Sequence, residues 1–317
     1  MTARPVTARR EGPAGHVWVD GEILPADARH LSVFDRGFQL GDGIFETLRA
    51  RGGTAAELGA HLARLHRSAA GLDIELPGDI DVVIERGICD LLAADGLGGA
   101  DGDASIRITV SRGVYHARGV LPPNEAATAT VAIQAWPVVA APADHLDRGL
   151  HLVTSAVRRD PRNPLATLKT TSRAEYVYAR LEARRAGADD ALFLTIDDHL
   201  SEGTSANIFM VRRGSDDQLE LATPSLDCAI LPGTTRSWLL DWGERVGLRS
   251  VEGLLRHADL ASADEAFLSS SVAGILPVTR FDGAPIGDGR PGPWTARARA
   301  AREEMLGEVG ADAATHA

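Results

Sequence analysis

Near its middle, the 317-residue chain shifts to proline and alanine over residues 137–149, which hold two prolines and three alanines. Such a change of composition between periodic segments is typical of a linker, and a chain of this length can form two domains. The sequence therefore predicts a smaller N-terminal domain and a larger C-terminal one. The boundaries that we expect are a flexible tail at 1–15, a small α/β domain at 16–137, the linker at 138–149, a large domain at 150–307 and a flexible tail at 308–317.

Apolar periodicity predicts both helices and strands in each half, so the fold class that we expect is α+β. Apolar residues recur at helical spacings in 56–71 and 80–94, whereas they alternate as in a β-strand in 106–112. In the second half, the predicted strands are 151–157, 191–195, 207–211 and 265–268, and the predicted helices are 173–187, 236–246 and 294–306.

Lys169 is the only lysine of the chain, and every other side chain with a permanent positive charge is an arginine. An arginine cannot form a Schiff base, because its guanidinium group does not deprotonate in proteins. A chain that uses arginine for its surface charge and keeps one lysine is expected to need an amine there. Glu202 follows in a Ser-Glu-Gly segment, and we interpret the two as a pair in which Lys169 binds an aldehyde cofactor and Glu202 tunes its ring.

Composition limits the classes of protein that this chain can represent. The net charge of −11 argues against a nucleic-acid surface, which is usually basic. No segment approaches the roughly 18–20 apolar residues of a membrane span, and the first 15 residues lack the apolar core of a signal peptide. The two cysteines, Cys89 and Cys228, fit neither a disulfide framework nor a metal site. We therefore expect a cytoplasmic protein that binds no metal, nucleic acid or membrane.

Six short segments carry a more specific signal when they are taken together and in order. They are Phe38–Glu46, His61–Leu65, Ala166–Tyr176, Ser201–Phe209, Leu231–Arg236 and Ser269–Val278. Together they resemble the class IV, or fold type IV, pyridoxal-phosphate enzymes. The resemblance extends over residues 16–307. It implies a small α/β domain, a larger pseudo-barrel domain that binds pyridoxal 5'-phosphate, an active site at the domain boundary, and a homodimer.

The resemblance also implies which residues hold the cofactor. Lys169 would form the Schiff base and move protons, and Glu202 would bind the protonated ring nitrogen. Arg64 would be the cationic donor to the phosphate, since arginine binds phosphate with two parallel hydrogen bonds. The other cofactor-binding residues that we expect are Leu231 against the ring face and Gly233, Thr234, Thr235, Ser270 and Ser271 around the phosphate.

The residues that bind the substrate are less closely defined by the same resemblance. Phe45 occupies a position where D-amino acid aminotransferases carry a tyrosine. In those enzymes a loop arginine, followed two positions later by a histidine, reaches the substrate carboxylate. Arg118 could take that role here, but Val120 replaces the histidine. Tyr115 and His116 of the same loop are further candidates for the pocket wall.

Three activities within the family remain open from the sequence. Our first expectation is transfer of the amino group of a D-amino acid, or of an R-amine, to a 2-oxo acid such as 2-oxoglutarate. The alternative is an aminodeoxychorismate lyase that makes 4-aminobenzoate and pyruvate, since the lyase pattern of Asn-Arg after the lysine is half matched by Ser172 and Arg173. Branched-chain L-amino acid transamination ranks third, because that subfamily places a tyrosine where this chain has Ala174.

Overall fold

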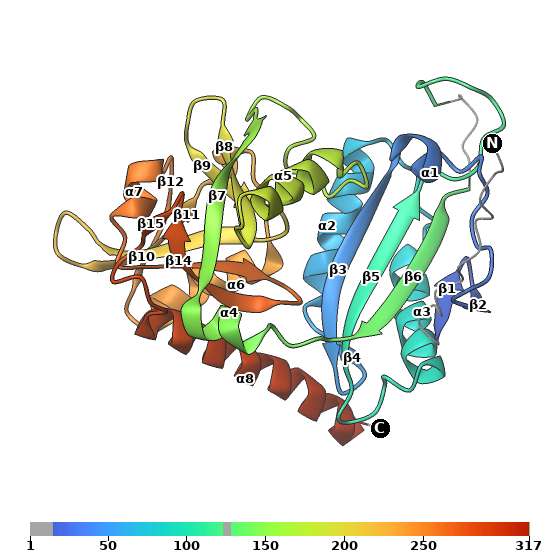
Figure 1. The fold of residues 1–317 in the computed structure, drawn as a ribbon. Coiled ribbons are helices and arrows are strands. Elements are labelled where there is room, and N and C mark those ends of the chain that lie inside the picture. Colours follow the sequence, from blue (N-terminus) through green and yellow to red (C-terminus); the bar gives the residue numbers. More distant parts are fainter. Residues whose placement is uncertain (1–14, 123–127, 317) are drawn as a thin grey trace, which may run out of the picture.

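The computed structural model describes residues 15–122 and 128–316, with side chains described up to Ala311. The expected tail at 1–15 therefore lies almost wholly outside the described residues. The described chain forms two β-sheets, each with its own helices, which lie side by side in Figure 1. The α+β class and the two-part architecture predicted from the sequence are confirmed.

The small domain is a six-stranded sheet. Its strands are β1 (His16–Val19), β2 (Glu22–Pro25), β3 (Gly43–Arg51), β4 (Thr54–Ala55), β5 (Asp103–Ser111) and β6 (Thr130–Pro137), in the order β2-β1-β6-β5-β3-β4, and its helices are α1 (Arg36–Leu40), α2 (Leu58–Gly71) and α3 (Ile80–Ala94). Alternation along β5 buries Ile106 and Ile108 in the core that α2 and α3 share with the sheet. Arg107, between them, therefore belongs to the opposite face.

The large domain contains a closed barrel. Its strands are β7 (Leu150–Arg159), β8 (Asp190–Thr195), β9 (Leu200–Gly203), β10 (Asn207–Arg213), β11 (Leu219–Pro224), β12 (Arg249–Gly253), β13 (Glu265–Ser270), β14 (Gly274–Phe281) and β15 (Ala284–Pro285). The pairing runs β10-β13-β14-β7-β8-β9, and β9 pairs back with β10 where Glu202 lies opposite Asn207. This closure brings two polar side chains of the Ser-Glu-Gly and Asn-Ile-Phe segments together at one point of the barrel.

The helices of the large domain are α4 (Ala143–Arg148), α5 (Ala174–Arg185), α6 (Thr234–Arg245), α7 (His257–Ala261) and α8 (Pro293–His316). The first of them, α4, occupies much of the segment predicted as a linker, and β7 follows it directly. Among the described residues, no helix combines the length and the apolar character that crossing a membrane requires.

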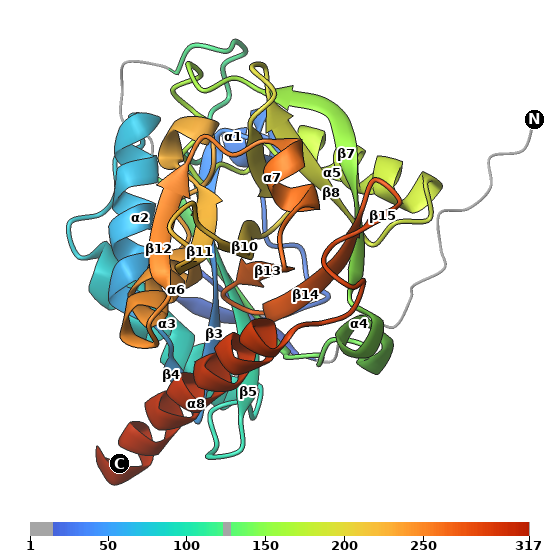
Figure 2. The same cartoon turned by 90° about the vertical axis from the view of Figure 1, so that its left-hand side faces the viewer.

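The last helix, α8, connects the two domains. Figures 1 and 2 show it running from beside β14 to the edge of the small-domain sheet near β4. We expect a helix at 294–306 and a loose tail from 308, whereas the helix continues to His316. The residues from 307 to 316 include three alanines and a glutamate, which favour a helix. Gly310 packs against the turn at Gly52, where a Cβ would lie 2.9 Å from the Gly310 Cα.

Candidate active site

A cavity of about 500 Å³ lies where the two domains meet. Its walls come from β3, β5 and α2 of the small domain and from β9, β10, β13, α5 and α6 of the large one. Ten residues predicted from the sequence line this cavity: Phe45, Arg64, Lys169, Glu202, Leu231, Gly233, Thr234, Thr235, Ser270 and Ser271.

Lys169 belongs to the loop between β7 and α5, but its backbone is bound to the small domain. The N–H of Phe45 donates to the Lys169 carbonyl at 2.9 Å, and the Lys169 N–H donates to the Ser68 hydroxyl at 3.1 Å. Burial of the amino group, with the charge of nearby Arg64, lowers the pKa of Lys169 from 10.5 to about 7. A substantial fraction of the amine is therefore neutral near pH 7 and able to act as a nucleophile.

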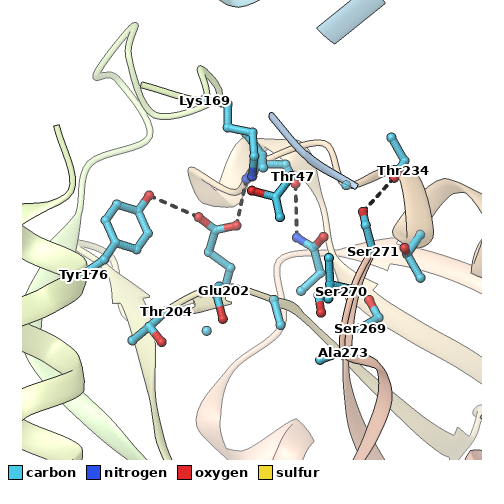
Figure 3. A pocket seen from close by; sticks show the side chains of 18 of the residues that line it. Thr47, Lys169, Tyr176, Glu202, Thr204, Thr234, Ser269, Ser270, Ser271 and Ala273 are labelled. Carbon is cyan, nitrogen blue, oxygen red and sulfur yellow. Dashed lines mark hydrogen bonds between the residues drawn. The ribbon is translucent and has the colours of Figure 1, made fainter. Parts of the chain in front are cut away.

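Glu202 lies at the point where β9 and β10 close the barrel. Its carboxylate accepts hydrogen bonds from the Leu231 N–H at 2.9 Å and from the Tyr176 hydroxyl at 3.3 Å (Figure 3). Arg159 approaches the same carboxylate to 3.9 Å. These contacts fix the carboxylate in the cavity wall, and its remaining lone pairs can accept a hydrogen bond from a protonated ring nitrogen.

The start of α6 forms a cup for an anion. Gly233 precedes the helix and Thr234 begins it, so the first N–H groups of the helix have no partner within it and can donate to an anion. Position 233 requires glycine, because a Cβ there would lie 2.2 Å from the Asn207 Oδ1. The hydroxyls of Ser271 and Thr234 are 3.2 Å apart (Figure 3), and the buried Ser269 hydroxyl has no partner among the described residues. These donors match the acceptors of a phosphate group.

Arg64 reaches this cup through a network that the sequence analysis does not identify. Its Nε and Nη2 donate to the Glu46 carboxylate at 2.8 and 2.6 Å, and its Nη1 donates to the Pro232 carbonyl at 2.9 Å. The two nitrogens of the His61 ring lie 2.8 Å from Glu46 and 3.3 Å from the Thr234 hydroxyl. Burial opposes the charge of Glu46, but hydrogen bonds from Arg64 and His61 outweigh it and lower the pKa of Glu46 to about 2.

Three cationic groups surround the Phe45 ring. The guanidinium of Arg107 lies 4.0 Å from the ring centre, Lys169 Nζ lies 4.7 Å from it, and the guanidinium of Arg173 lies 5.8 Å from it. Burial, assisted by the charge of Arg173, lowers the pKa of Arg107. Within the described part of the chain, neither arginine forms an ion pair, although Arg173 donates to the Thr204 carbonyl at 3.0 Å. Two such guanidinium groups in a cavity are suited to bind a carboxylate.

The loop residues predicted to bind substrate lie elsewhere in this single copy of the chain. Arg118 and His116 are exposed, and neither they nor Tyr115 line the cavity. The His116 ring packs against Phe34, and Tyr115 lies beneath the guanidinium of Arg36. Their role in substrate binding stays a prediction.

Comparison with known proteins agrees with this geometry. Residues 43–281 match the family model for amino-transferase class IV. The chain belongs to the class IV aminotransferases. A branched-chain-amino-acid aminotransferase of Escherichia coli is 30% identical over 295 residues, which cover 90% of this chain and 90% of that protein. A D-alanine aminotransferase of Bacillus licheniformis is 28% identical over 295 residues, 92% of this chain and 96% of that protein.

Solved structures of two family members have the same fold. A T.th. branched-chain amino acid aminotransferase with pyridoxamine 5'-phosphate has a TM-score of 0.84 and 27% identity, covering 93% of this chain and 95% of that one. A 4-amino-4-deoxychorismate lyase from Pseudomonas aeruginosa has a TM-score of 0.76 and 33% identity, covering 91% and 98%. Members of two activities within the family therefore share the architecture described above.

As a class IV aminotransferase, this enzyme depends on pyridoxal 5'-phosphate, and the donors around the cavity fit that cofactor. Lys169 would bind its aldehyde carbon, Glu202 its ring nitrogen, and the α6 cup with Arg64 its phosphate. When bound, the cofactor withdraws electrons from the substrate Cα. Lys169, with its lowered pKa, would then take the proton from the substrate Cα and deliver it to the cofactor carbon that had carried the aldehyde.

The cavity also contains Tyr176, which the sequence analysis does not single out. Ala174 begins α5, and Tyr176 in the first turn directs its hydroxyl to Glu202. In the sequence, the alanine at position 174, where the branched-chain subfamily carries a tyrosine, counts against that subfamily. Tyr176, two positions later, places a phenol in the cavity instead.

Proposed function

We propose that the enzyme transfers the amino group of a branched-chain L-amino acid to a 2-oxo acid such as 2-oxoglutarate. The observation that carries this proposal is the pair Arg107 and Arg173, which flank Phe45 and lie near Lys169 without a carboxylate of their own among the described residues. The apolar ring of Phe45 can contact a branched aliphatic side chain. The acidic co-substrate, such as 2-oxoglutarate, carries two carboxylates. The two arginines can bind both of them, whereas a single cation would neutralise only one.

The proposal reverses the order that the sequence alone favours. From the sequence, a D-amino acid is the first expected amino donor, but the named relatives support the branched-chain activity more strongly. The arginine pair also argues against carboxylate-free R-amines. Such a substrate would leave Arg107 and Arg173 partly desolvated and unpaired, which is costly for a buried cation.

Lyase activity is the second candidate, and one observation favours it. Arg173, the part of the lyase-like pattern that this chain retains, lies in the cavity close to the Phe45 ring. The lyase from Pseudomonas aeruginosa is also 33% identical to this chain. The substrate of a lyase carries carboxylates that the same two arginines could bind.

Half-reaction spectroscopy distinguishes these activities. The purified enzyme with bound cofactor is mixed with L-leucine, L-valine, D-alanine or 1-phenylethylamine of R configuration, and the visible absorbance is followed. We expect L-leucine and L-valine to bleach it and 2-oxoglutarate to restore it. Bleaching by D-alanine alone would support the D-amino acid activity. Pyruvate release from aminodeoxychorismate, with no bleaching by any amino acid, would support the lyase.

We also propose that the enzyme acts as a homodimer. Apolar side chains are exposed on two segments that are hydrogen-bonded to each other through Arg36 and the carbonyls of Gly119 and Val120. These exposed side chains are Leu31, Val33, Phe34, Phe38, Leu40, Val120 and Leu121. Exposed large apolar side chains gathered on neighbouring segments are typical of an interface. A second copy seated there would surround the loop of Arg118, which could then reach a cavity in its partner.

Light scattering during gel filtration tests the dimer. A mass twice that of the 33.5 kDa chain is expected, and Phe38→Glu with Leu121→Glu should lower it to that of one chain. A wild-type enzyme that elutes as a single chain at micromolar concentration would contradict the proposal.

A further inference from the structure

Arg302 is a buried cation outside the cavity that none of the roles above includes. It lies on α8, and its side chain is 1% exposed. Its Nη2 donates to the Glu57 carboxylate and, at 3.3 Å, to the Thr235 hydroxyl. The guanidinium also lies 5.3 Å from the centre of the Trp238 ring. The side chain therefore joins α8 to elements of both domains.

Thr235 gives this contact a direct connection to the anion cup. It is the second residue of α6 and lines the cavity beside Thr234. A threonine hydroxyl has one hydrogen to donate and two lone pairs to accept with. Because Arg302 can only donate, the hydroxyl must accept in this contact. Its own hydrogen is thereby left available for an anion in the cavity.

Glu57 connects the same arginine to the other wall of the cup. It precedes α2 with a left-handed backbone (φ 54°) and has no side-chain capping bond to the helix. The helix that it precedes carries His61, whose ring lies 3.3 Å from the Thr234 hydroxyl of α6, and Arg64, which donates to the Pro232 carbonyl just before α6. Arg302 therefore holds the starts of α2 and α6 at a fixed separation.

The charge of Arg302 is only partly compensated. Its Nε and Nη1 are buried with no hydrogen-bond partner among the described residues. Its carboxylate partner, Glu57, is 20% exposed and thus partly screened by water. A buried cation with unsatisfied donors is unfavourable unless negative charge lies near it. An anion bound at the start of α6 would supply that charge.

We propose that Arg302 is a positioning residue for the phosphate of the bound cofactor. It orients the Thr235 hydroxyl toward the phosphate and keeps the Arg64 helix against the α6 cup. The inference rests on the family of the enzyme and on the cup. It is independent of which amino acid is the substrate.

The test compares two ligands that differ only in the phosphate. Full-length enzyme freed of cofactor is titrated with pyridoxal 5'-phosphate and with pyridoxal, and binding is followed by absorbance. Arg302→Met should raise the Kd for pyridoxal phosphate about tenfold, about the effect of losing one hydrogen bond, because the Thr235 hydroxyl would no longer be oriented toward the phosphate. The Kd for pyridoxal should change less than about twofold. Arg302→Lys, which keeps the charge, should recover part of the loss.

Arg236→Met is the matched control. Arg236 is 4% exposed and follows Thr235 in the first turn of α6. It donates to the Pro224 carbonyl and to Glu252, and it does not line the cavity. We expect it to lower stability while leaving the preference for the phosphorylated ligand unchanged. Equal losses for both ligands in Arg302→Met would overturn the proposal, because a general structural role predicts them. A similar loss of phosphate preference in Arg236→Met would overturn it too.

A second set of variants keeps the test decisive if Arg302→Met does not fold. Arg302→Lys is then measured with and without Thr235→Val, which keeps the side-chain shape and removes the hydroxyl. If Arg302 acts through Thr235, the lysine substitution weakens phosphate-dependent binding only while the hydroxyl is present. The same fold-change in both backgrounds would show that Arg302 does not act through Thr235.

Discussion

The lowered pKa of Lys169 has a consequence for the stability of the cofactor-free enzyme. In the unfolded chain this amine titrates near its ordinary value of 10.5, whereas in the fold it titrates near 7. Protonation therefore favours the unfolded chain. The cost to folding is present in full below pH 7 and disappears as the pH rises above 10.5. Lys169→Met removes the amine and should stabilise the cofactor-free enzyme most at low pH.

The size of the effect follows from the two pKa values. A difference of one between the pKa of the folded and the unfolded chain corresponds to about 1.4 kcal/mol. The cost at Lys169 is therefore about 5 kcal/mol at pH 6 and about 2 kcal/mol at pH 9. The gain in the free energy of unfolding on Lys169→Met should thus shrink by about 3 kcal/mol between these two pH values.

Urea unfolding of the two cofactor-free proteins at pH 6 and pH 9 measures this difference. Other titrating groups contribute equally to both proteins and cancel in the comparison. A gain that stays constant with pH would refute the reasoning, since it would mean that Lys169 has the same pKa in the folded and unfolded chain. A gain that grows with pH would show that the amine is stabilised in its charged form.

Three further variants test other parts of the site. Glu202→Gln should retain the cofactor but lower turnover by about 10²–10³, the usual cost of losing one preorganised electrostatic contact at a reacting centre; a rate near that of the wild type would show that another acid binds the ring nitrogen. Arg64→Met combined with Glu46→Gln, which avoids a buried unpaired carboxylate, should weaken cofactor binding by about 2–3 kcal/mol; unchanged retention on dialysis would count against a phosphate contact. Arg107→Met should raise the KM for 2-oxoglutarate, which has two carboxylates, by about tenfold and the KM for 4-methyl-2-oxopentanoate, which has one, much less. Equal changes in the two KM values would show that Arg107 does not bind the second carboxylate of 2-oxoglutarate.

Apolar periodicity predicted individual helices and strands, because each depends mainly on the residues within it. The apolar stripe at 80–94 corresponds to α3 residue for residue, because burial of one face of a helix leaves a periodic signal. The closure of the barrel between β9 and β10 leaves no such signal. It rests on one pair, Glu202 opposite Asn207, and strand partners are decided by packing across the whole domain.

The residues of the cavity also divide into those that a short sequence segment indicates and those that only the fold brings together. Lys169 and Glu202 could be predicted because each belongs to a short segment with a distinct residue pattern. Arg107 could not, since it lies on β5 and meets the Lys169 segment only in the folded chain. Arg173 was predicted only as half of a lyase-like pattern, and neither its place beside Phe45 nor the contact of Tyr176 with Glu202 could be read from that segment. One signal for Glu46 was present in the sequence: it occupies the same face of β3 as the buried residues around it, where a carboxylate requires a partner.

Reduction of the native enzyme with borohydride tests the central claim most directly. The chain has one lysine, so a cofactor attached to that amine should appear after proteolysis as a mass increase on the peptide that contains Lys169. The visible absorbance should vanish on reduction and should be missing in Lys169→Met. A cofactor adduct on the N-terminal amine, or visible absorbance that persists in Lys169→Met, would contradict the account.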